Sequence, residues 1–595
     1  MSRTVGAVYD VVIMGGGPAG STLGALLVRQ HGLRVAIFDK ERFPREHIGE
    51  SFAHTMVPAL EQSGALEKVL ASDCWVKKYG GGVFNWGGTP MVALFDQANY
   101  LRDNVHRYSM HVNRAEFDHL LLQHAADSGV EVFEGAPVSA FDSDAEGCTV
   151  TLKDGTTVAS RYFVDASGRR NSIAAKEKRD WLSGYRNIAI WQHFLGGKFT
   201  QHLPGDWNVF REDNLSPIGC FAFRDGWCWY IPVPKIINGE RRLTHSIGIV
   251  TSPEILKQDG FDFTDQATFV RAVKSIPYLK DLITDAEPIA DKMLTATNYS
   301  MINGQFADLD QRWMLVGDAA YFVDPLFSSG AGFATNMAVN AATVLTDTLS
   351  GQLDEQATRD LWRDYDDGWH SMAETFALSI DQWYHALGKG KEDSIYWHQR
   401  GSQPDLDIQE RTFDVLINTA VTAHVLQAIV DEKPVEGMAP APLSGEGPLS
   451  RAAERTGTTD MESEAVPVLA PGVVVRESVG LDVPGFKGFL PAAPFDQDID
   501  EKTRDAIATY WSDPIEHSDA IPSPVAGPVP AFRFSFEGAE PGDEVRGLAR
   551  EGAHELVRLL GQGLTLRQLN ERLSFIQRHM LRRLIRAGMV TAGGA

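Results

Sequence analysis

The first 180 residues alternate short apolar runs with amphipathic stretches. Residues 9–30 predict a buried strand, a glycine-rich turn and a helix, and residues 33–40 predict the next strand. This alternation is typical of a mostly parallel sheet with covering helices. Residues 183–289 instead show runs of period two that end in polar turns, which predicts antiparallel strands.

The chain returns to a strand, a loop and a long helix after residue 312. We therefore predict an α/β fold whose first domain is discontinuous in sequence. Its three parts are residues 1–80, 110–182 and 290–350, and the β-rich insertion is residues 183–289.

One predicted strand of the insertion has the sequence GWCWYIP, residues 226–232. Its alternation places Trp227, Trp229 and Ile231 on one face. Two tryptophans on one face are costly to expose, so they belong either to an ordinary core or to a wall that must stay closed. The pattern alone leaves both open.

The remainder of the chain predicts three further parts. Residues 351–430 are rich in helix formers and predict a helical extension. Residues 431–472 are rich in Pro, Gly, Ser and Glu without an apolar period, which predicts a flexible linker. Residues 473–595 predict a C-terminal domain, and residues 545–592 within it resemble a winged-helix segment.

Composition is that of an ordinary globular protein, with 43% apolar and 23% charged residues. No apolar run is long enough to span a membrane and no cleavable leader is visible, so we expect a cytoplasmic protein that does not bind membranes. The four cysteines show no metal-ligand spacing, so we expect neither a metal site nor a disulfide scaffold.

Net charge is −24, which argues against nucleic acid as the main partner. The end of the chain differs, because residues 561–595 hold six arginines and one glutamate. The arginines are Arg567, Arg572, Arg578, Arg582, Arg583 and Arg586.

A nucleotide site is predicted near the N-terminus. Gly15, Gly17 and Gly20 form G-x-G-x-x-G between the first strand and helix, and Asp39 ends the second strand. The glycines allow a tight turn, close approach of a pyrophosphate, and close packing of the helix on the strand, while the acid accepts ribose hydroxyls. Because all these parts occur together, the motif predicts dinucleotide binding rather than a structural turn.

Three further segments carry a family resemblance: VNRAEFDHLLLQHA (112–125), FVDASGRRNSIA (163–174) and MLVGDAAYFVDP (314–325). With the glycine motif they resemble the FAD-containing aromatic hydroxylase superfamily, over residues 8–350. The resemblance implies a Rossmann-like FAD-binding domain with an antiparallel substrate domain. It also implies that Arg114 and Asp318 contact FAD.

Four segments are similar to one branch, the flavin-dependent halogenases: FPREHIGES (43–51), WVKKYGGGVFNWG (75–87), WCWYIP (227–232) and FVDPLFSSG (322–330). By this resemblance Arg45 and Glu50 also bind the cofactor. The enzyme would use reduced FAD (FADH2), O2 and chloride or bromide. No second dinucleotide motif is visible in the sequence, so we expect a separate flavin reductase to supply the reduced cofactor.

Halogenase chemistry gives these residues distinct roles. A reduced flavin and oxygen together offer an electrophilic oxygen, which hydroxylates an organic substrate or converts a halide to hypohalous acid. The enzyme therefore needs a halide pocket and a wall that excludes the substrate. Ser328, Ser329 and Gly330 are the predicted halide turn, with backbone N–H groups ahead of a helix. Trp227 and Trp229 are the predicted wall.

A lysine would deliver the hypohalous acid, by polarising it or by becoming a chloramine. By resemblance this lysine follows the second βα unit, where Lys77 and Lys78 both stand. We favour Lys78, which precedes the glycine run. The alternatives are Lys77 and a pair of solvated surface lysines.

One position departs from the tryptophan-halogenating branch, which has a glutamate just before the serine of the halide segment. Here this substrate-proximal position is Phe327. No carboxylate is available there to support a positively charged arene. We therefore expect a substrate activated by its own substituents, such as a phenol, a tyrosyl group or a pyrrole, in natural-product biosynthesis. The substrate is either free or tethered to an acidic carrier protein.

Three other functions remain open from the sequence. An aromatic hydroxylase is the nearest, because it shares the FAD framework. A non-catalytic flavoprotein sensor and a DNA-binding C-terminal segment are the others.

Overall fold

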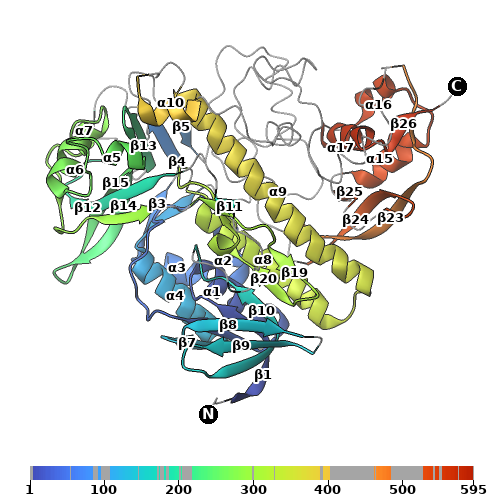
Figure 1. The fold of residues 1–595 in the computed structure, drawn as a ribbon, viewed down its shortest axis with the longest axis horizontal. Coiled ribbons are helices and arrows are strands. Elements are labelled where there is room, and N and C mark those ends of the chain that lie inside the picture. Colours follow the sequence, from blue (N-terminus) through green and yellow to red (C-terminus); the bar gives the residue numbers. More distant parts are fainter. Residues whose placement is uncertain are drawn as a thin grey trace.

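A computed structural model describes residues 4–593, with gaps at 54, 79, 85–90, 95–107, 145, 170–172, 174–179, 182–185, 200–202, 204–217, 298–299, 327, 389–392, 402–460, 462–463, 484–526, 540–542, 549–551 and 574. Figure 1 shows two sheets, one long helix that runs past both, and a separate C-terminal unit. Among the described residues, no helix is both long and apolar enough to cross a lipid bilayer.

The first sheet is mostly parallel, as predicted. Its central path runs β19-β20-β10-β1-β2-β7, and every neighbouring pair on this path is parallel except β19 with β20. A hairpin of β8 and β9 extends the sheet from β10. The strands are β1 (Thr4–Met14), β2 (Val35–Asp39), β7 (Glu131–Glu134), β8 (Val138–Ser143), β9 (Cys148–Leu152), β10 (Thr157–Asp165), β19 (Ala307–Asp308) and β20 (Trp313–Leu315).

Two helices, α1 (Pro18–His31) and α4 (Arg114–Asp127), pack against this sheet, and α8 (Gly330–Ser350) packs against α1. The strands of this first sheet come from both sides of the β-rich insertion, since β10 precedes it and β20 follows it. Every residue of β2 is buried, which is the continuous apolar pattern of a strand covered on both faces.

The second sheet is mostly antiparallel, with the order β16-β12-β15-β14-β13-β4-β5 and β17 beside β12. Its strands are β4 (Gly80–Phe84), β5 (Met91–Leu94), β12 (Ile188–Leu195), β13 (Ile218–Phe223), β14 (Gly226–Ile237), β15 (Glu240–Thr251), β16 (Glu287–Pro288) and β17 (Leu294–Thr297). The predicted limits 183–289 were therefore too narrow. β17 falls within residues 290–350, which the sequence assigned to the first domain, yet it pairs with β12 of the second sheet. Pairing between distant strands decides which sheet a strand joins, and the apolar pattern does not show this pairing.

Short elements join the two sheets. β3 (Trp75–Lys78) pairs with β6 (Ser109–Val112), and β11 (Asp180–Trp181), β18 (Met301–Ile302) and β21 (Tyr321–Phe322) form a third small sheet. A 3-10 turn spans Gly317–Ala319. The short helices are α2 (Met56–Ser63), α3 (Leu66–Leu70), α5 (Pro253–Leu256), α6 (Gln266–Val273) and α7 (Leu279–Leu282). The four cysteines are free and buried.

The predicted helical extension contains α9 (Glu355–Gly388) and α10 (Ile395–Gly401). α9 is amphipathic, and its buried face includes Tyr365, Trp369, Phe376 and Tyr384, which join the main core. Figure 1 shows α9 as a long diagonal helix, with its first turns near the C-terminal unit and its last turns near α10.

The C-terminal unit has its own apolar core. It consists of β22 (Pro467–Leu469), β23 (Val473–Gly480), β24 (Val529–Phe536), β25 (Glu544–Leu548), α15 (Ala553–Leu560), α16 (Leu566–Arg572), α17 (Phe575–Arg586) and β26 (Val590–Ala592). The predicted linker 431–472 lies mostly outside the described residues, but its limit at 472 was wrong. Residues 467–469 form β22, because pairing with β26 satisfies their backbone groups.

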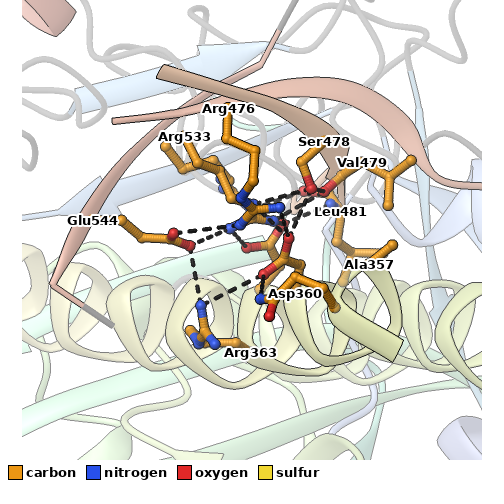
Figure 2. Close-up of polar contacts among 12 residues, drawn as sticks. Ala357, Asp360, Arg363, Arg476, Ser478, Val479, Leu481, Arg533 and Glu544 are labelled. Atoms are coloured by element: carbon orange, nitrogen blue, oxygen red, sulfur yellow. Dashed lines mark hydrogen bonds and ion pairs between the residues drawn. The ribbon is translucent and has the colours of Figure 1, made fainter. Parts of the chain in front are cut away.

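A buried ionic cluster joins this unit to α9 (Figure 2). Arg533 is 2% exposed, and its Nη2 lies 3.0 Å from Asp364 Oδ2. Its Nη1 lies 2.8 Å from Glu544 Oε1, and its Nε lies 3.2 Å from Asp360 Oδ2. Arg476 adds a 2.7 Å contact to Asp360. Buried charges of this kind need several partners to offset desolvation, and the cluster supplies them from both sides.

Candidate active site

The glycine turn has the close contacts that its motif predicts. Gly15 has φ +110°, and a Cβ there would lie 2.4 Å from the carbonyl oxygen of Ala166. A Cβ on Gly20 would lie 2.0 Å from the carbonyl oxygen of Gly15, so α1 packs closely on the strand. Gly17 is the N-cap of α1, whose N-terminus attracts anions. Asp39 Oδ2 accepts a 2.7 Å hydrogen bond from Gly16 N, which fixes the turn against β2.

A cavity of about 360 Å³ begins at this turn and reaches the second sheet. Predicted cofactor, wall and halide residues line it together. They are Gly15, Gly17, Asp39, Arg45, Glu50, Arg114, Trp227, Trp229, Asp318, Ser328 and Gly330. Of the other predicted residues, Gly20, Lys78 and Ser329 are described but do not line it, and Phe327 lies outside the described residues.

The predicted cofactor arginines are held by a buried carboxylate. Arg114 Nε donates to Asp118 Oδ1 at 2.8 Å, and Arg45 Nη1 donates to Asp118 Oδ2 at 3.3 Å. Arg114 Nη1 also donates to the carbonyl oxygen of Ile48 at 2.8 Å. These contacts fix the segment around Ile48 beside the cavity, where a cofactor could bind.

Asp318 lies in the 3-10 turn before β21 and lines the same cavity. About a quarter of its side chain is exposed, at a cavity whose lining includes it, and burial raises its pKa. Arg169, which sequence reasoning did not single out, lies 3.9 Å away and opposes this rise. The position of Arg169 in the ASGRR segment, close to Asp165, is the sequence feature that could have identified it.

The tryptophan face is as predicted, because Trp227, Trp229 and Ile231 all line the cavity. Trp227 and Trp229 are 2% and 5% exposed, and their ring centroids are 6.2 Å apart. Tyr230, between them, faces the other way and stacks on His245 at 4.5 Å. The two tryptophans therefore belong to the core and also form a wall of the cavity.

Hydrogen bonds hold both indoles. Trp229 Nε1 donates to Ser246 Oγ at 3.1 Å, and Trp227 Nε1 donates to Tyr384 Oη of α9 at 2.8 Å. The motif gave no signal for Tyr384, which lies more than 150 residues later in the chain. These bonds fix the ring planes that face the cavity.

The predicted halide turn leads directly into α8. Ser328 has φ +58°, whereas Ser329, the N-cap of α8, has φ −83°. This alternation of φ sign is typical of anion-binding backbone concavities. The Ser329 hydroxyl is buried and has no hydrogen-bond partner among the described residues. The turn thus combines the N–H groups that begin α8 with a buried hydroxyl that lacks a partner among the described residues.

The two lysines differ sharply, because neighbouring residues of β3 point to opposite faces. Lys78 is 3% exposed, and its Nζ donates to Ser51 Oγ at 3.0 Å and to the carbonyl oxygen of Phe52 at 2.8 Å. Burial lowers its pKa to about 7, which Cys220 partly opposes. Lys77 is exposed and lies over the ring of Tyr108.

Glu50 has a partner that the sequence did not reveal. His193 of β12 lies 2.6 Å from its Oε1. Burial alone would raise the pKa of Glu50, but the charge and hydrogen bond of His193 lower it. The Glu50–His193 pair connects the segment that lines the cavity around Glu50 to β12 of the second sheet.

Comparisons with known proteins point to one family. A family model described as tryptophan halogenase matches residues 10–105 and 96–426. A tryptophan 2-halogenase from Chondromyces crocatus is 29% identical over 395 residues, which is 65% of this chain and 69% of the relative. A 1H-pyrrole-2-carbonyl (peptidyl-carrier protein) chlorinase from Pseudomonas fluorescens is 30% identical over 351 residues, which is 56% of this chain and 74% of the relative.

Solved structures extend the likeness. The myxobacterial chondrochloren halogenase CndH is 25% identical with a TM-score of 0.56, and the match covers 74% of this chain and 93% of CndH. The flavin-dependent halogenase CmlS, at 22% identity and a TM-score of 0.65, shares the fold over 99% of this chain and 97% of its own. These findings favour a halogenase over the aromatic hydroxylase. The chain belongs to the tryptophan halogenase family and is a flavin-dependent halogenase, an FAD-dependent oxidoreductase.

Proposed function

We propose that this enzyme transfers a halogen from chloride or bromide to an electron-rich aromatic ring. The observation that carries the proposal is Lys78, whose buried amine contacts Ser51 at the cavity and has a pKa lowered to about 7. A desolvated lysine of low pKa is nucleophilic at neutral pH, which an exposed lysine is not.

The cavity suits FAD. The glycine turn allows close approach of a pyrophosphate at the N-terminus of α1, and Arg45 and Arg114 add positive charge. Asp39 and Asp318, which also line the cavity, would contact the bound FAD. When bound and reduced by a separate flavin reductase, FAD supplies with O2 the oxidising power that converts halide to hypohalous acid.

Ser328, Ser329 and Gly330 would hold the halide through backbone N–H groups and the Ser329 hydroxyl. Trp227 and Trp229 would keep the organic substrate away from the cofactor. The halide turn and the two tryptophans line the same cavity, which supports this division of roles.

Lys78 would then control the hypohalous acid. Its ammonium can hydrogen-bond and polarise the acid. Alternatively, its neutral amine attacks the halogen, an N–halogen bond forms as the O–halogen bond breaks, and water leaves with the amine proton. The ring carbon would next take the halogen, return the electron pair to nitrogen and lose its proton to solvent.

The substrate we propose is a phenol, tyrosyl or pyrrole group tethered to a carrier protein, most simply a tyrosyl group. Phe327 offers no carboxylate to stabilise a poorly activated ring, so the ring must carry its own activating group. The pyrrole-carrier chlorinase among the relatives supports a tethered substrate.

We also propose that the C-terminal unit is winged-helix-like and docks the carrier. Three helices followed by β26, paired with β22, support the first point. Arg567 and Arg572 are exposed, which supports the second, since a carrier is generally acidic. The side chains of Arg578, Arg582 and Arg586 lie outside the described residues.

The test is mass spectrometry of candidate phenols and carrier-bound tyrosine after incubation with protein, FAD, a flavin reductase, oxygen and bromide. We expect a product heavier by one bromine in place of hydrogen. A hydroxylated product without any brominated one would contradict the proposal.

A further inference from the structure

Tyr384 lies where three parts of the protein meet. It is in the last turns of α9, fully buried, and its hydroxyl faces both the tryptophan strand and the segment before the halide turn. Its ring packs against Tyr396 and Trp397 of α10, with centroids 6.3 Å and 5.9 Å away. This packing holds the hydroxyl in place.

The hydrogen bonds around Tyr384 have a fixed direction. Trp227 Nε1 can only donate, so Tyr384 Oη accepts its bond at 2.8 Å. The single phenol proton is then donated to Asp324, whose two carboxylate oxygens both lie 3.2 Å away. Each bond in such a chain polarises the next and strengthens it.

Asp324 in turn shapes the halide turn. Its Oδ1 accepts from Leu326 N at 3.0 Å, and its Oδ2 accepts from Asn187 Nδ2 at 3.2 Å. Asp324 is 1% exposed, so a buried carboxylate depends on these donors for its stability. Moving Tyr384 would therefore move both Trp227 and the start of the segment that ends at Ser328.

We propose that Tyr384 is a positioning residue that sets the distance between the tryptophan wall and the halide turn. Through that distance it sets the affinity of the halide site. The inference rests on the halide site of the proposed function, but the residue and its role come from the Trp227–Tyr384–Asp324 chain alone.

The experiment measures bromide binding to the oxidised holoenzyme by isothermal titration calorimetry, together with halogenated product formed per FADH2 consumed. Tyr384→Phe keeps the ring and removes the hydroxyl. We expect the bromide Kd to rise about tenfold, because the hydroxyl no longer ties Trp227 to the buried charge of Asp324 and the halide turn loses its fixed position. The yield per FADH2 should fall with it.

Tyr365→Phe is the matched control. Tyr365 is a buried tyrosine of the same helix, and its hydroxyl donates to the carbonyl oxygen of Leu315 at 2.8 Å. Its loss should cost similar stability and leave the bromide Kd unchanged. Trp227→Phe removes the indole donor and should raise the Kd in the same direction as Tyr384→Phe, so it decides the question if the latter variant does not fold.

The possible results distinguish failure of the halide site from failure of the role of Tyr384. A wild-type holoenzyme that binds no bromide overturns the halide site and this inference with it. Bromide binding by the wild type that stays unchanged in folded Tyr384→Phe and Trp227→Phe overturns the inference alone. An equal loss in Tyr365→Phe also overturns it, because the effect would then be a general loss of packing.

Discussion

The Nζ of Lys78 lies 3.0 Å from the Oγ of Ser51, a residue that lines the cavity beside Glu50. The lysine itself stands behind that lining, at the end of β3, rather than in open solvent. Ser51 therefore connects the lysine with the segment around Glu50 that lines the cavity. This contact places the buried amine of Lys78 directly behind the lining of the cavity.

The tryptophan wall gives the first prediction. Trp227→Ala and Trp229→Ala should each lower the free energy of unfolding by about 3–5 kcal/mol, as expected for truncating a buried tryptophan. In a variant that still folds, small phenols should reach the cofactor and be hydroxylated. Thermal unfolding is measured first, and products are then analysed by mass spectrometry. A folded variant with wild-type product and coupling would show that the face is only core.

The source of electrons gives the second prediction. The purified protein should be yellow and bind FAD, but it should turn over only when another enzyme supplies FADH2. The reason is that the sequence shows one dinucleotide motif, at Gly15, Gly17 and Gly20. Absorbance at the NADPH band follows oxidation with and without an added reductase. Substantial NADPH oxidation by the protein alone would contradict the two-component account.

The ionic cluster at Arg533 gives the third prediction. Arg533→Met should lower the free energy of unfolding by about 3–5 kcal/mol, because Asp360 and Asp364 would keep their charges in a buried site. Arg567→Met is the control, since Arg567 and Glu464 are 62% and 61% exposed and such pairs contribute at most about 1 kcal/mol. Denaturant titration measures both. Equal effects would mean that the cluster does not join α9 to the C-terminal unit energetically.

The C-terminal arginines give the fourth prediction. Carrier-bound tyrosine should be halogenated faster than free tyrosine, and high salt should remove most of the advantage, because complementary charge mainly accelerates encounter. The comparison uses both substrates at low and high salt. Equal rates on the two, or no effect of salt on the bound form, would leave docking without support.

Much of this site follows from short-range patterns. The glycine motif, the alternation at Trp227 and Trp229, and the serine turn before a long helix each depend on residues close in sequence, so periodicity and motif spacing show them. Neighbouring residues of a strand face opposite ways, which is why Lys78 is buried and Lys77 is exposed.

The partners of these residues could not be predicted. Tyr384, His193 and Arg169 come from other elements, and only the packing of α9, β12 and the segment after β10 brings them to the site. β17 and β22 were misassigned for the same reason, because strand pairing over long separations leaves no local pattern.

The fifth prediction concerns the pH dependence of Lys78. Because burial lowers its pKa to about 7, the amine loses its proton as pH rises through that value, and halogenation by the chloramine route should rise with it. The same depressed pKa makes the folded state bind fewer protons than the unfolded state above pH 7. The contribution of Lys78 to the free energy of unfolding should therefore increase as the pH rises from about 7 toward the ordinary pKa of lysine.

The most direct measurement compares Lys78→Ala with Lys77→Ala in the holoenzyme supplied with FADH2, oxygen and bromide. Lys78→Ala should lose halogenated product while it still binds FAD and releases peroxide, because the amine acts after the flavin step. Lys77→Ala should keep wild-type product, since its side chain is exposed over Tyr108. Near wild-type halogenation by Lys78→Ala would contradict the account.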